Sequence, residues 1–164
     1  MSNDQALTNF VGLSSVLTGY SVDELNPPIS PEPVAAEYLA ILHARVDPVD
    51  PALVDKLLTT YQNIAAQFPD PQQQAEQVQQ QILNDSQMGP VAWNILRMWY
   101  LSIWYFLDQT QPITGFSAGQ VVSMNAYVKG LAWDVMQAHP MGYSEMHFGY
   151  WADPPQPDDP TANS

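Results

Sequence analysis

Residues 91–107 read VAWNILRMWYLSIWYFL, a stretch that is apolar almost all the way around a helix. A membrane-spanning helix needs about 20 consecutive apolar residues. This run has 17 residues and contains Asn94 and Arg97, and polar or charged groups inside a bilayer carry a large free-energy cost. We therefore expect residues 91–107 to form a buried helix of a helical protein rather than a membrane span.

Aromatic side chains occupy two faces of this predicted helix. Trp93, Tyr100 and Trp104 fall near one azimuth, and Trp99 and Phe106 fall on another. A helix of a small bundle usually needs only one apolar stripe. The second face therefore needs a second cover, which is either the other helices of this chain or another protein, and the periodicity is equally consistent with both. Trp and Tyr are enriched at the centres of protein interfaces.

Apolar residues at helical spacing, interrupted by prolines, predict further helices on both sides of this stretch. Asp50-Pro51 and Asp70-Pro71 each place a capping carboxylate before a proline at the first helical position. Asp4 and Ser117 are candidate N-caps, and Gly19 is a candidate stop. The expected helices span residues 5–17, 32–45, 51–68, 71–83, 91–107 and 117–138.

These elements predict an all-α fold, a small helical bundle of about five to six helices with an irregular C-terminal tail rich in proline and aromatic residues. No segment alternates clearly enough to predict a sheet. We expect the bundle to occupy residues 1–138 and the extended tail residues 139–164. Within the tail, residues 139–155 are expected to dock on a partner, and the chain after residue 156 is expected to be flexible.

Composition excludes several classes of function. Four Lys and Arg residues face 17 Asp and Glu residues in 164, for a formal net charge of -13. Nucleic-acid binding needs a basic surface, so we expect no nucleic-acid partner. The negative net charge also disfavours binding to an anionic membrane. The acidic surface either keeps an apolar protein in solution or complements a basic partner. Since there is no cysteine, disulfides, thiolate metal sites and cysteine nucleophiles are excluded.

Motifs of known chemistry are missing. The glycines form neither GxGxxG nor a Walker loop, and there is no GxSxG or HExxH motif. We expect no catalytic, cofactor-binding or metal-binding residue in this chain. The alternative is a metal-dependent enzyme that uses Asp134, His139, Glu145 and His147, although Pro140 interrupts the regular structure that would fix their geometry.

Three short segments carry a family resemblance. They are FVGLSSVLTG at residues 10–19, MWYL at residues 98–101, and Tyr143-Ser144 followed by GYWADPP at residues 149–155. In order and approximate spacing they resemble the small subunit of bacterial membrane-associated, FAD-dependent sugar and polyol dehydrogenases, the sorbitol, fructose and glucose dehydrogenase complexes.

The resemblance implies a helper subunit that has no cofactor of its own. In such complexes a catalytic subunit of the glucose–methanol–choline oxidoreductase type holds FAD and oxidises the sugar, and a cytochrome c subunit can carry electrons to the membrane. The small subunit supports maturation, stability and export, commonly by lending a twin-arginine signal. We expect a periplasmic location if such a leader was removed or lies on the partner, and a cytoplasmic one if Met1 is the natural start. Ser144 replaces the family's cysteine, so no covalent tether is expected there.

We therefore expect a non-catalytic subunit that binds, stabilises and helps mature an FAD-dependent dehydrogenase. A homodimer formed through the aromatic faces is a further alternative to the metal-dependent enzyme. The expected partner-binding residues combine the aromatic helix with the tail: Trp99, Tyr100, Tyr143, Ser144, Gly149, Tyr150, Trp151, Ala152 and Asp153.

Overall fold

A computed structural model describes residues 2–29, 33–105 and 119–140 of the chain. The predicted all-α class is confirmed, because helices dominate and the described strands form only one two-stranded sheet. The helices are α1 (Asn3–Thr18), α2 (Val22–Leu25), α3 (Val34–Val46), α4 (Leu53–Gln67), α5 (Pro71–Val78) with its π-helical continuation η1 (Gln79–Leu83), α6 (Met88–Leu101), α7 (Met124–Val128) and α8 (Leu131–Val135). The strands are β1 (Ile103–Tyr105) and β2 (Gly119–Val121).

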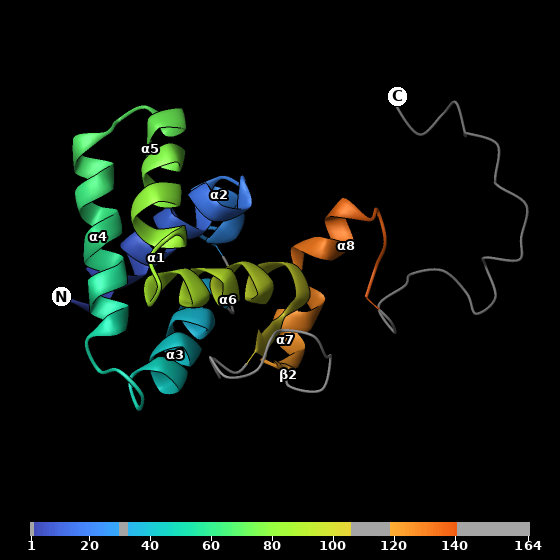
Figure 1. Ribbon diagram of the computed structural model, residues 1–164. Helices are drawn as coiled ribbons and strands as arrows, with labels where there is room; N and C mark the ends of the chain where they lie inside the picture. Colours follow the sequence, from blue (N-terminus) through green and yellow to red (C-terminus); the bar gives the residue numbers. More distant parts are fainter. Residues whose placement is uncertain (1, 30–32, 106–118, 141–164) are drawn as a thin grey trace, which may run out of the picture.

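Helix α6 lies at the centre of this arrangement. Helices α4 and α5 stand side by side with α1 behind them, α6 crosses below them, and α3 lies beneath α6 (Figure 1). The sheet, α7 and α8 gather at the C-terminal end of α6, which contacts α1, α3, η1, β1, α7 and α8. No helix among the described residues is long and apolar enough to cross a membrane. The stretch predicted to be a buried helix therefore packs against elements from both halves of the chain, and α1 connects it to α2, α4 and α5.

Local capping explains where several helices begin and end. The Asp70 carboxylate accepts from Gln73 N with Pro71 at the first helical turn, as predicted for α5. Gly19 ends α1 as predicted, with φ 81° and its N–H donated to Ser15 O. The prediction of Asp4 as the α1 cap was wrong, because Ser2 caps Gln5 N instead. The helix predicted to begin at Asp50-Pro51 also begins later than expected, because residues 51–52 form a turn and α4 starts at Leu53.

The predicted helix 91–107 ends early, at Leu101. Ser102 adopts a left-handed conformation with φ 57°, and its N–H donates to Met98 O at 2.9 Å. Its hydroxyl donates to Ala126 O at 2.6 Å and its carbonyl accepts from Val122 N at 2.9 Å. The chain then continues as β1, which pairs antiparallel with β2 in the register Ile103↔Val121. These distant hydrogen bonds compensate for the cost of a left-handed serine.

The long helix predicted for residues 117–138 is replaced by β2 and two short helices. Ser123 caps α7 by accepting from Ala126 N, whereas the predicted cap Ser117 lies outside the described residues. Gly130 separates α7 from α8, and a Cβ built on it would lie 3.0 Å from Ser102 Oγ and 3.2 Å from Tyr100 O. The close approach of this turn to the end of α6 therefore favours glycine, because a side chain would force its neighbours to shift by a few tenths of an ångström.

The core is built around a cluster of three rings. Trp99 packs edge-on against Tyr38 with ring centroids 4.9 Å apart, and it stacks on Phe10 at 6.5 Å. All three rings are buried. Neither Tyr38 Oη nor Trp99 Nε1 has a hydrogen-bond partner. Burial raises the pKa of Tyr38, and the nearby Ser102 hydroxyl offsets part of that rise, although Ser102 donates its proton to Ala126 O instead.

We predict that Tyr38→Phe stabilises the fold by about 1 kcal/mol at pH 7, because it removes a buried hydroxyl without a partner. A tyrosine with a raised folded pKa contributes stability that is present below its ordinary value of about 10 and lost as the pH rises through the folded value. The variant should therefore also lose less stability than the wild type above about pH 10.

Urea unfolding at pH 7 and above about pH 10 measures the free energy of unfolding of both proteins under the two conditions. Tyr105→Phe, at a partly exposed tyrosine of β1, is the matched control. A variant less stable than wild type at pH 7 would show that the Tyr38 hydroxyl is satisfied in the folded protein.

Candidate protein-interaction surface

One face of α6 is only partly covered by the described elements. Pro90, Trp93 and Leu101 are exposed, and Leu96, Arg97 and Tyr100 are partly exposed. At about 100° per residue these six side chains fall within one sector of about 140°. We call this face the α6 stripe. Trp93 is 51% exposed and Leu101 47%, so the stripe presents large apolar side chains to solvent.

The opposite face of α6 is buried in the core. Val91, Ala92, Ile95, Met98 and Trp99 are all less than 4% exposed. Of the two aromatic faces that the sequence distinguishes, the Trp99 face is thus covered by this chain's own helices, whereas Trp93 remains half exposed.

The expected partner-binding residues lie in different environments, and most of them are outside the described residues. Trp99 lies in the core at 3% exposure, so its indole is not on the described surface. Tyr100 lies at the edge of the stripe, where its hydroxyl donates to Thr18 O at 3.1 Å and its ring meets Tyr20 edge-on. The expected tail residues lie outside the described residues: Tyr143, Ser144, Gly149, Tyr150, Trp151, Ala152 and Asp153.

Trp104 does not join Trp93 on one helix face, as the periodicity predicted. It belongs to β1 and is 3% exposed, because the chain reverses at Ser102. Leu101, which sequence reasoning did not single out, takes its place at the exposed end of the stripe. The spacing of Trp93, Arg97 and Leu101 by four residues was the available signal.

Arg97 lies against the ring of Tyr105, which Asn94 in turn holds in place. Its guanidinium carbon lies 4.9 Å from the centroid of the Tyr105 ring, within cation–π range. The Tyr105 backbone N–H in turn donates to the buried Asn94 side chain at 3.0 Å. Among the described residues, the charge in the middle of the stripe therefore contacts an aromatic ring rather than a carboxylate.

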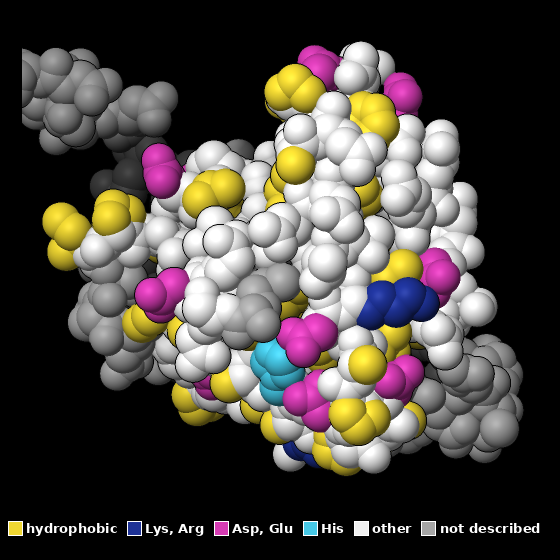
Figure 2. All heavy atoms as spheres, turned by 90° about the vertical axis from the view of Figure 1, so that its left-hand side faces the viewer, with side chains coloured by type: hydrophobic (Ala, Val, Ile, Leu, Met, Phe, Trp, Pro, Cys, Tyr) yellow, Lys and Arg dark blue, Asp and Glu magenta, His cyan; other side chains and the backbone are white. Residues whose placement is uncertain are grey.

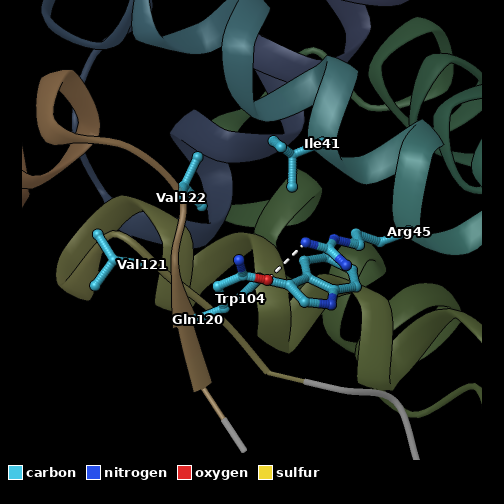
Figure 3. Close-up of a pocket in the computed structure, with 6 residues that line it drawn as sticks. All are labelled: Ile41, Arg45, Trp104, Gln120, Val121 and Val122. Carbon is cyan, nitrogen blue, oxygen red and sulfur yellow. Dashed lines mark hydrogen bonds between the residues drawn. The ribbon is translucent and has the colours of Figure 1, made fainter.

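A pocket between α3 and the sheet has no room for an organic substrate. It is lined by Ile41, Arg45, Trp104, Gln120, Val121 and Val122 (Figure 3). Its volume of about 30 Å³ holds a water molecule or two, far below the roughly 300–1,000 Å³ of ligand pockets. Arg45 Nη2 donates to Gln120 Oε1 at 2.7 Å across it, which connects α3 to the sheet.

Only part of the alternative metal site can be placed. Asp134 lies exposed on α8 and His139 is exposed after it, whereas Glu145 and His147 lie outside the described residues. Within the described ranges no three His, Asp or Glu side chains are grouped so as to hold a metal ion.

The face that contains α4 shows acidic and apolar side chains in small separate groups (Figure 2).

We predict opposite outcomes for two tryptophans on the same helix. Trp99→Ala should lower the free energy of unfolding by about 3–5 kcal/mol, since it empties part of the core. Trp93→Ala should change it by less than about 0.5 kcal/mol, as for a surface substitution. Urea unfolding followed by circular dichroism measures both, and equal losses would contradict the exposure of Trp93.

The α6 stripe is an apolar surface held on a rigid helix, and surfaces of this kind mark sites where proteins bind one another. Comparisons with protein-family models, curated proteins and solved structures gave no match to this chain.

Proposed function

We propose that this chain is a non-catalytic small subunit that binds and stabilises a larger enzyme, the catalytic flavoprotein subunit of an FAD-dependent sugar or polyol dehydrogenase. The observation that carries the proposal is the α6 stripe, with Trp93 at 51% and Leu101 at 47% exposure. The family resemblance of residues 10–19, 98–101 and 143–155 supplies the identity of the partner.

The stripe has the properties of an interface centre. Trp and Tyr carry a large share of binding energy where water is excluded, and α6 presents Trp93 and Tyr100 together with two leucines. The helix is fixed by buried contacts on its other face, so these side chains are positioned before the partner arrives. Such preorganisation lowers the entropic cost of association.

Binding would stabilise the partner by mass action. A protein that binds only the folded form of its partner adds a stabilisation that grows with its free concentration relative to Kd. In this proposal FAD is held by the partner, a cytochrome c subunit can complete the complex, and residues 143–153 form a second contact. Assistance with export follows the same resemblance.

Co-expression with the catalytic flavoprotein subunit tests the proposal. We expect the flavoprotein to be soluble, loaded with FAD and active when both chains are present, and to lose solubility or FAD content when this chain is absent. A flavoprotein that is equally soluble, loaded and active alone would contradict the proposal.

We further predict that Trp93→Ala weakens the complex by about 30-fold or more, corresponding to a loss of about 2 kcal/mol. Val49→Ala is the control, because Val49 is 81% exposed but lies in the turn between α3 and α4. Titration calorimetry with the purified subunits measures both affinities. Equal affinities for the two variants would exclude Trp93 from the interface.

A further inference from the structure

We draw no further inference here: the strongest candidate, the partly exposed α6 stripe around Trp93 and Arg97, belongs to the site already described, and nothing in the structure shows whether residues 106–118, the C-terminal segment or a particular surface of another protein covers it.

Discussion

The structure depends on the reversal of the chain at Ser102. Helix α6 is apolar on nearly every side, and a continuation to residue 107 would have carried Trp104 onto the face of Trp93. The left-handed Ser102 ends the helix instead, and hydrogen bonds to Ala126 and Val122 keep the reversed chain in place. Trp104 is thereby buried against α3 in β1, whereas Trp93 on α6 remains 51% exposed.

The two tryptophans within α6 lie in different environments. Trp99 contributes to the stability of the chain itself, because it lies between Phe10 and Tyr38 in a core that excludes water. Trp93 contributes little to that core and is available for another surface. A tryptophan that remains half exposed on a rigid helix keeps an unfavourable contact with water, and binding to a protein surface would remove that contact.

Charge and apolar surface are separated in the same molecule. Most of the acids precede α6 in the sequence, and α6 itself carries only Arg97. A net charge of -13 opposes self-association through a neutral apolar face, because two such molecules repel each other. The same charge would attract a basic partner.

Local sequence signals determined the elements whose structure depends on near neighbours. Asp70-Pro71 begins α5, Gly19 ends α1, and the apolar spacing of α4 buries Leu57, Leu58 and Ile64. Each of these outcomes involves a hydrogen bond or a periodicity within about one or two helical turns, which a reader of the sequence can evaluate.

Tertiary structure alone decided the end of α6, the small sheet and the division of residues 117–138 into β2, α7 and α8. Ser102 favours no left-handed conformation by itself, and it adopts one because Ala126 and Val122, which lie at least 20 residues away, supply its partners. Trp99 became the core tryptophan of α6 because Phe10 of α1 and Tyr38 of α3, both distant in sequence, pack against it. Periodicity places side chains around a helix, but only the packing of remote segments determines which face is covered.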